Sequence, residues 1–138
     1  MSKKYVLDAC SVIAFLADEE GADTIEKLVH EAIDKDTSLF MNKLNLYEVL
    51  YDMQKSQGES EAIDTVNSFI SLPVAIIDII SDDLMIEAAY FKTNYSVSVA
   101  DSFALATAKI YDAALVTSDH HEFDPVDKIE EITFLWIR

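Results

Sequence analysis

Four acidic residues stand where carboxylates can do chemistry. Asp8 directly follows the apolar residues 6–7, and Asp119 ends the segment that begins with the apolar residues 115–116. Glu48 lies early in one helical pattern, and Asp101 lies in the first turn of another. Carboxylates that converge repel one another, so a cation is needed to offset their charge. Mg²⁺ and Mn²⁺ prefer oxygen ligands and assist phosphodiester hydrolysis, so these acids are candidate metal-binding and catalytic residues.

Each acid also has a purely structural interpretation. Asp101 could be the third helical residue of a capping box that begins at Ser98. Asp119 could be a turn or cap residue, and Glu48 could be a surface residue with an ion-pair partner. Asp8 is the hardest to explain in this way, because a carboxylate just after a buried strand needs a partner. The combination of the four acids, rather than any one of them, favours a metal site.

Short apolar runs alternate with helical patterns along the chain. Strands are predicted at residues 5–7, 38–41, 74–77, 113–117 and 133–137. Helices are predicted through residues 15–16, over 23–33 and over 44–57. Three further helices are predicted from serine caps: one from Ser60 to about residue 70, one after Ser81 over residues 82–94, and one after Ser98 into an alanine-rich segment. This alternation predicts a three-layer α/β/α fold around a parallel five-stranded sheet. Ligands of such folds bind at the carboxyl ends of the strands, so the four acids are expected to converge there.

Length and composition limit the class of protein. Residues 1–138 are expected to form a single domain, because this length allows a sizeable core. The hydrophobic share of 51% argues against disorder, and the single cysteine excludes a disulfide scaffold. No signal-peptide pattern and no apolar run long enough to cross a bilayer is present, so a cytoplasmic protein without membrane contact is expected.

The net charge is strongly negative. Ten Lys and Arg residues against 26 Asp and Glu residues give −16. This balance argues against a broad basic face for nucleic acid and against an anionic membrane surface. It suits a bound cation or a basic protein partner.

Four segments, in this order, resemble the PIN-domain ribonucleases, above all the VapC-type toxins of toxin–antitoxin pairs. The segments are residues 6–13 (VLDACSVI), 45–49 (NLYEV), 99–106 (VADSFALA) and 115–119 (LVTSD). The resemblance implies a three-layer PIN-like fold. It also implies a Mg²⁺- or Mn²⁺-dependent endoribonuclease that cuts RNA to leave a 5′-phosphate and a 3′-hydroxyl.

The same resemblance implies residue roles and partners. The four acids, Asp8, Glu48, Asp101 and Asp119, would coordinate the metal ions. Four further residues are possible supporting groups: Ser11, Asn45, Thr117 and Ser118. Asn45 lies one turn before Glu48 and could either orient its carboxylate or be a simple surface amide. The resemblance further implies a homodimer and a small DNA-binding antitoxin that inserts a basic side chain into the acidic site.

Two other functions remain open. A non-catalytic PIN-like binding module that pairs with a basic protein partner would also suit the charge of −16. A receiver domain of a response regulator is also small, acidic and metal-binding, but it needs a lysine after its last strand. Here the last predicted strand runs to Arg138 without one.

Several residues are given structural roles. Residues 120–125 (HHEFDP) are interpreted as a solvated loop that ends in a turn before the proline. Within this segment, Glu122 is a possible addition to the site beyond Asp119. Cys10, which stands where many PIN-domain relatives carry serine or threonine, is expected to be a small buried hydrophobic residue. Trp136 is expected to lie in the core.

Overall fold

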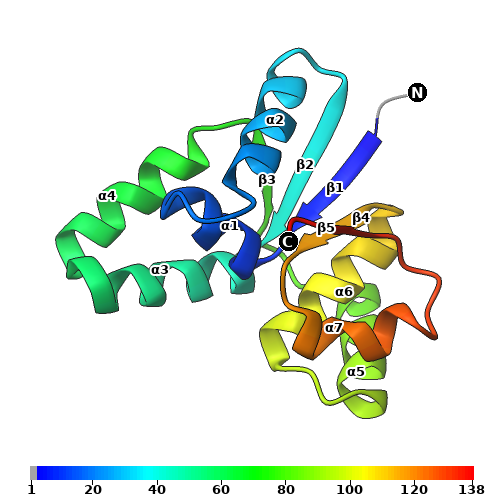
Figure 1. The fold of residues 1–138 in the computed structure, drawn as a ribbon. Helices are drawn as coiled ribbons and strands as arrows, with labels where there is room; N and C mark the ends of the chain where they lie inside the picture. The colour runs from blue at the N-terminus through cyan, green and yellow to red at the C-terminus, as the bar shows by residue number, and fades with distance from the viewer. Residues whose placement is uncertain (1–2) are drawn as a thin grey trace.

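A parallel sheet of five strands forms the centre of the protein. The structure, a computed structural model, describes residues 3–138. The strands are β1 (Lys3–Leu7), β2 (Thr37–Asn42), β3 (Val74–Ile77), β4 (Ala114–Thr117) and β5 (Phe134–Trp136). Their order in the sheet is β3-β2-β1-β4-β5, and all pairs are parallel (Figure 1). The strands that precede Asp8 and Asp119, β1 and β4, are therefore neighbours at the centre of the sheet.

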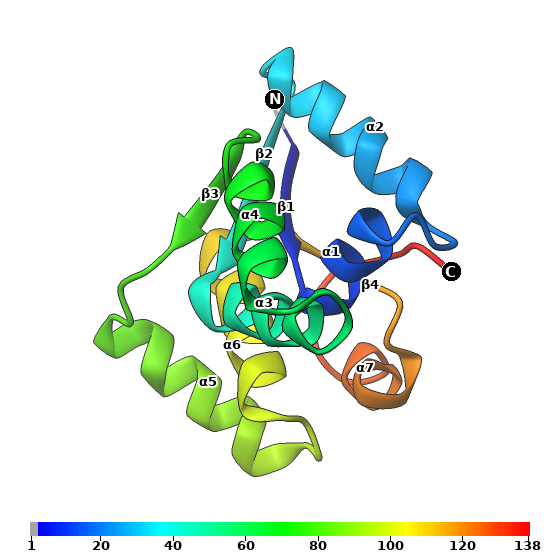
Figure 2. The same ribbon diagram turned by 90° about the vertical axis from the view of Figure 1, so that its left-hand side faces the viewer.

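Helices cover both faces of this sheet. One face packs against α1 (Ala9–Leu16), α2 (Ala22–Ile33), α3 (Lys43–Gln57) and α4 (Glu59–Ile70). The other packs against α5 (Asp82–Asn94), α6 (Val99–Tyr111) and α7 (His120–Asp127) (Figures 1 and 2). The predicted three-layer α/β/α fold with a parallel five-stranded sheet is confirmed. Among residues 3–138, none of the helices combines the length and the apolar character needed to cross a membrane.

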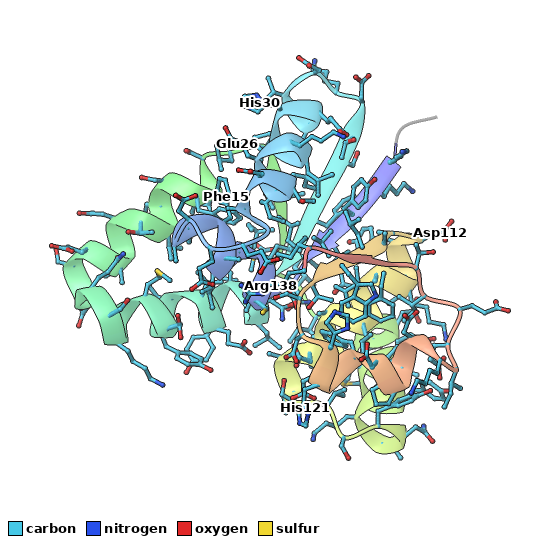
Figure 3. All side chains as sticks on the ribbon, in the orientation of Figure 1. Phe15, Glu26, His30, Asp112, His121 and Arg138 are labelled. Carbon is cyan, nitrogen blue, oxygen red and sulfur yellow. The ribbon has the colours of Figure 1, made fainter. Side chains whose placement is uncertain are left out.

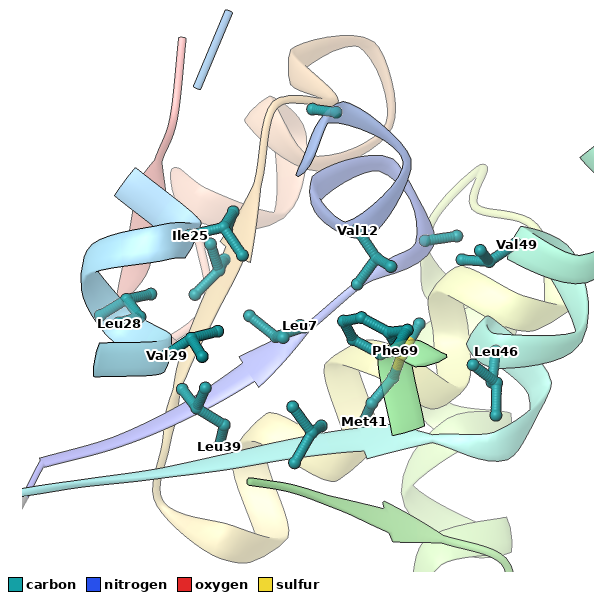
Figure 4. Close-up of a cluster of buried hydrophobic side chains, with 14 of the residues drawn as sticks. Leu7, Val12, Ile25, Leu28, Val29, Leu39, Met41, Leu46, Val49 and Phe69 are labelled. Carbon is teal, nitrogen blue, oxygen red and sulfur yellow. The ribbon is translucent and has the colours of Figure 1, made fainter. Parts of the chain in front are cut away.

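The alternation of side chains along the strands separates the two cores. Leu7 and its register partner Val116 belong to the core on the face under α1 and α2. Figure 4 shows Leu7 in this core with Val12 and Val29. The preceding residue of β1, Val6, points to the opposite face. Because both faces are covered, the carboxyl-terminal parts of β1 and β4 are buried on both sides, as Val6 and Leu7 of β1 show. At the carboxyl edge of the sheet, Asp8 directly follows β1, and Asp119 lies two residues after the end of β4.

Helix caps agree with the sequence at two of the three predicted positions. Ser81 and Ser98 accept hydrogen bonds from backbone N–H groups three residues later, at 3.2 Å and 3.1 Å. The predicted cap at Ser60 is wrong, because α4 already begins at Glu59. Its N-terminal cap is Gly58, whose φ of +86° lies in the region that glycine tolerates best.

The loop predicted over residues 120–125 is wrong, because these residues belong to α7. Asp119 caps the helix by accepting a hydrogen bond from the backbone N–H of Glu122 at 3.1 Å. Pro125 lies inside the helix and removes one backbone donor. Burial of Phe123 and Val126 in the core under α6 stabilises the helix against that loss.

Candidate metal centre

Asp8 lies between β1 and α1, at the centre of the carboxyl edge. It is the N-terminal cap of α1 and is only 1% exposed. One carboxylate oxygen accepts a hydrogen bond from the backbone N–H of Ser11 at 2.8 Å. The other accepts one from the hydroxyl of Thr117 at 2.5 Å. Both oxygens are thus held in fixed directions, as expected for a buried carboxylate.

Thr117 connects two of the predicted acids. It ends β4 and is fully buried. Its hydroxyl donates to Asp8 and accepts a hydrogen bond from the backbone N–H of Asp119 at 3.0 Å. A single side chain therefore sets the position of the Asp8 carboxylate relative to the backbone that carries Asp119.

The tightest acidic group contains Asp101, Asp119 and Glu122. One carboxylate oxygen from each of these residues lies within 4.8 Å of the others, a spacing that could hold a metal ion. Asp101 comes from the first turn of α6, whereas Asp119 and Glu122 come from the start of α7. One carboxylate oxygen of Glu122, Oε2, is buried without a hydrogen-bond partner. A buried carboxylate oxygen without a partner is costly, and a cation would satisfy it.

Asp8 and Glu48 lie beside the group of Asp101, Asp119 and Glu122 but are not members of it. Glu48 is half-buried on α3, and its pKa is raised first by partial burial and then by repulsion from Asp119. Burial raises the pKa of Asp8 to about 6, although its hydrogen bonds act in the opposite direction. The structure thus brings all four predicted acids into one electrostatic neighbourhood.

Asp101 shows the effect of this crowding most clearly. Its side chain is buried, at 8% exposure. Burial, followed by repulsion from Asp8 and Glu48, raises its pKa to about 7. The pKa of Glu122 is raised for the same kinds of reason, by burial and by Asp119. Converging oxygen donors whose negative charges are uncompensated are the ligands that Mg²⁺ and Mn²⁺ prefer, so the residues present fit such an ion.

The four possible supporting residues have different surroundings. Thr117 contacts Asp8 directly, as described above. The hydroxyl of Ser11 donates to the backbone carbonyl of Asp8 at 3.0 Å, so it contacts the cap and not the carboxylate. The hydroxyl of Ser118 lies 2.8 Å from the sulfur of Cys10. Cys10 is therefore half-buried in a polar contact beside the site, and its predicted role as a buried hydrophobic residue is wrong.

Asn45 links two helices instead of contacting Glu48. It is fully buried, and its Nδ2 donates to the carbonyl of Ala100 at 3.1 Å, which ties α3 to the start of α6. Its Oδ1 is buried without a partner. The surface-amide interpretation of Asn45 is thus wrong. The hydrogen bond to Ala100 positions the helix that carries Asp101 beside the helix that carries Glu48.

His120 and Trp136 have surroundings that differ from the predicted ones. The imidazole of His120 contacts Asp124 through Nδ1 at 2.8 Å and the carbonyl of Arg138 through Nε2 at 2.9 Å. Its ring stacks on Trp136, with centroids 3.8 Å apart. Trp136 is half-buried at the edge of the sheet rather than in the core, because β5 is the outermost strand on that side.

We expect the hydroxyl of Thr117 to be needed for the geometry of the site. Thr117→Val keeps the shape of the side chain but removes the partner of Asp8, so it should lower stability by about 1–3 kcal/mol. It should also weaken Mn²⁺ binding about 10- to 100-fold, as loss of a group that orients a ligand does. Urea unfolding and calorimetric titration with Mn²⁺ measure the two effects. Thr117→Ser, which keeps the hydroxyl, should restore most of both; equal behaviour of the valine and serine variants would contradict this role.

Fold and site together define a class of small α/β proteins with an acidic centre at the carboxyl ends of two central parallel strands. The sequence model of the PIN domain matches residues 5–129, and the chain belongs to the PIN domain family. No curated protein shows significant similarity to the chain.

Solved structures share this fold at low sequence identity. One such structure is VapBC2 from Rickettsia felis, bound to a DNA fragment from its promoter. A chain of that complex has 19% sequence identity to the present protein and a TM-score of 0.71, and the match covers 96% of the present chain and 97% of the VapBC2 chain. DNA-bound VapBC from Salmonella typhimurium gives 19% identity and a TM-score of 0.70, with 100% of both chains covered. VapC20 from Mycobacterium tuberculosis, a sarcin-ricin loop cleaving toxin, gives 15% identity and 0.66, with 88% of this chain and 94% of that chain covered.

Proposed function

We propose that this protein is a divalent-metal-dependent endoribonuclease and the toxin component of a toxin–antitoxin pair. One observation carries the proposal: oxygens of Asp101, Asp119 and Glu122 lie within 4.8 Å of one another, beside the buried Asp8, in a chain of the PIN domain family. The proposed metal ligands are Asp8, Glu48, Asp101 and Asp119, with Glu122 as a fifth acid. Residues 1–138 are proposed to act as one domain.

Hydrogen bonds within the chain hold the acidic side chains of the proposed site in position. Thr117 and the backbone of Ser11 hold Asp8 in place, and Asn45 holds the start of α6 against α3. Mg²⁺ or Mn²⁺, when bound, supplies activation of water for attack on the phosphodiester and stabilisation of the departing oxygen, which leaves a 5′-phosphate and a 3′-hydroxyl. The half-buried Glu48 and Glu122 face the same neighbourhood from α3 and α7. Acids from α3, α6 and α7 would therefore hold the ion, and the ion would separate them from the substrate phosphate.

The charge of the chain supports a basic protein partner. The net charge of −16 attracts a basic segment and repels free nucleic acid. Structures with the same fold include the VapBC complexes from Rickettsia felis and Salmonella typhimurium. We propose that an antitoxin occupies the acidic site with a basic side chain and that the toxin forms a homodimer in the cytoplasm.

Cleavage of a mixed pool of single-stranded RNA tests the proposed activity. The protein should cut in Mg²⁺ or Mn²⁺ and not in EDTA, and the new ends should be a 5′-phosphate and a 3′-hydroxyl. Asp8→Asn keeps the shape of the buried side chain and should abolish cutting. Asp64→Asn, at an exposed position of α4, is the matched control and should cut like the wild type.

The same assay separates the proposal from its alternative. A folded wild-type protein that neither cuts RNA nor binds Mg²⁺ or Mn²⁺ in calorimetry would contradict the nuclease. That result would favour a non-catalytic PIN-like module that pairs with a basic partner, for which the charge of −16 is the supporting observation.

A further inference from the structure

Three aromatic rings form a continuous stack along the edge strand β5. The His120 ring lies on Trp136 with centroids 3.8 Å apart and planes 11° apart. The Trp136 ring in turn lies over Phe134, with centroids 5.2 Å apart and planes 12° apart. The rings are thus nearly parallel, and His120 forms the outer end of the stack.

This stack borders the candidate metal centre. Trp136 is the register partner of Thr117, whose hydroxyl contacts Asp8. His120 directly follows Asp119, which belongs to the tight acidic group. The stack therefore runs along the edge strand β5, and its His120 end lies at the residue next to Asp119.

One face of the His120 ring is open. The other face is covered by Trp136, and both ring nitrogens are held by contacts with Asp124 and the carbonyl of Arg138. The His120 side chain nevertheless remains 49% exposed. The exposed surface must therefore lie mainly on the ring face opposite Trp136. The contacts at both nitrogens fix the plane of that face before any ligand arrives.

We propose that the open face of His120 binds an unpaired base of single-stranded RNA by stacking, next to the phosphodiester that is cut. This inference rests on the proposed nuclease function and adds how the substrate is held. Stacking on an aromatic ring does not depend on a basic surface and tolerates every base, because each base has a π-face. It therefore gives a protein with a net charge of −16 a way to hold RNA that its few cations do not supply. Trp136 and Phe134 support the ring from behind.

Trp136 makes the stacking measurable, because it is the only tryptophan in the chain. The probe is a short, labelled, mixed-sequence single-stranded RNA, mixed with cleavage-deficient Asp8→Asn protein in Mn²⁺. Anisotropy of the label gives the Kd, and Trp136 emission reports on the stack. The variants are His120→Ala, His120→Phe and the matched control His30→Ala. His30 lies on α2, away from α7, and contacts Glu26 four residues earlier, much as His120 contacts Asp124 (Figure 3).

We expect His120→Ala to raise the Kd about tenfold, which is within the range for loss of one stacked base. His120→Phe, which keeps a flat ring, and His30→Ala should both stay close to the parent protein. RNA should change Trp136 emission, and the same RNA made abasic should not. Equal Kd values for His120→Ala and His30→Ala, or equal emission changes with intact and abasic RNA, would overturn the stacking proposal.

The result is separable from that of the nuclease assay. Wild-type protein that cuts RNA while its His120→Ala variant binds normally would overturn stacking alone. Neither cleavage nor binding of RNA by folded protein would contradict both proposals. Thermal unfolding of each His120 variant identifies any loss of affinity that arises from loss of the fold.

Discussion

Asp101→Asn should reduce metal-dependent RNA cleavage by about a thousandfold or more. The substitution keeps the shape of the side chain but removes one charge from the tight acidic group. A metal ion contributes several kcal/mol to stabilisation of the transition state, and each 1.36 kcal/mol is a tenfold change in rate, so loss of a ligand has a large effect. Helix α6 should survive, because Ser98 caps it through the backbone N–H of residue 101 and not through the side chain. Initial rates at saturating Mn²⁺ measure the effect.

Asp112→Asn is the matched control for this variant. Asp112 is the exposed C-terminal cap of the same helix, whereas Asp101 lies in its first turn, at the opposite end. Its φ of +51° is a conformation that asparagine adopts readily. The control should therefore fold and cut like the wild type. An Asp101→Asn protein that cuts at the rate of this control would remove Asp101 from the proposed site.

Metal-free protein should lose stability as the pH rises from about 5 to 8. In the folded state the pKa of Asp8 is about 6 and that of Asp101 is about 7, whereas the ordinary value is 3.8. Within this window the folded protein keeps protons that the unfolded chain has released, so raising the pH favours unfolding. The loss is complete above the folded pKa values. Two buried carboxylates shifted this far correspond to a few kcal/mol of unfolding free energy.

Thermal or urea unfolding in EDTA at several pH values measures this dependence. Mn²⁺ should restore stability at pH 8, because it binds the deprotonated carboxylates of the folded state. Asp101→Asn should flatten the pH dependence and raise the Tm of metal-free protein at pH 8 by several degrees, while gaining less from Mn²⁺ than the wild type. Asp112→Asn should change neither. A wild-type stability in EDTA that rises from pH 5 to 8 would contradict the repulsion described for Asp8 and Asp101.

The order and type of most elements could be predicted from the sequence. Residues 74–77 and 82–94 have the predicted bounds, and the other predicted strands and helices differ by a few residues at their ends. The apolar runs and the serine caps at residues 81 and 98 are local signals, so they can be recognised without knowledge of the fold. The placement of Asp8 and Asp119 after strands follows from the same patterns, whereas the position of β1 beside β4 is a property of the folded sheet.

Helix α7 could not be predicted in this way, because two local signals conflict there. Asp124 and Pro125 suggest a turn. The pattern of Asp119 followed three residues later by Glu122 is a helix-capping signal, and the structure contains that cap. Taken alone, this pattern favours a helix that begins after Asp119 and has Glu122 in its first turn, but the turn signal opposes it. Packing of Phe123 in the core, which is a tertiary effect, decides the outcome.

The sequence by itself determined which acids follow strands and which lie at the start of helices, because strand ends and helix caps depend on short stretches of chain. Only the tertiary structure decided which groups touch. The hydroxyl of Thr117 contacts Asp8 across 109 positions of the chain, and Asn45 reaches the carbonyl of Ala100 across 55. Such contacts depend on strand order, on register and on burial. These properties also set the pKa values, because desolvation and repulsion act through space and not along the chain.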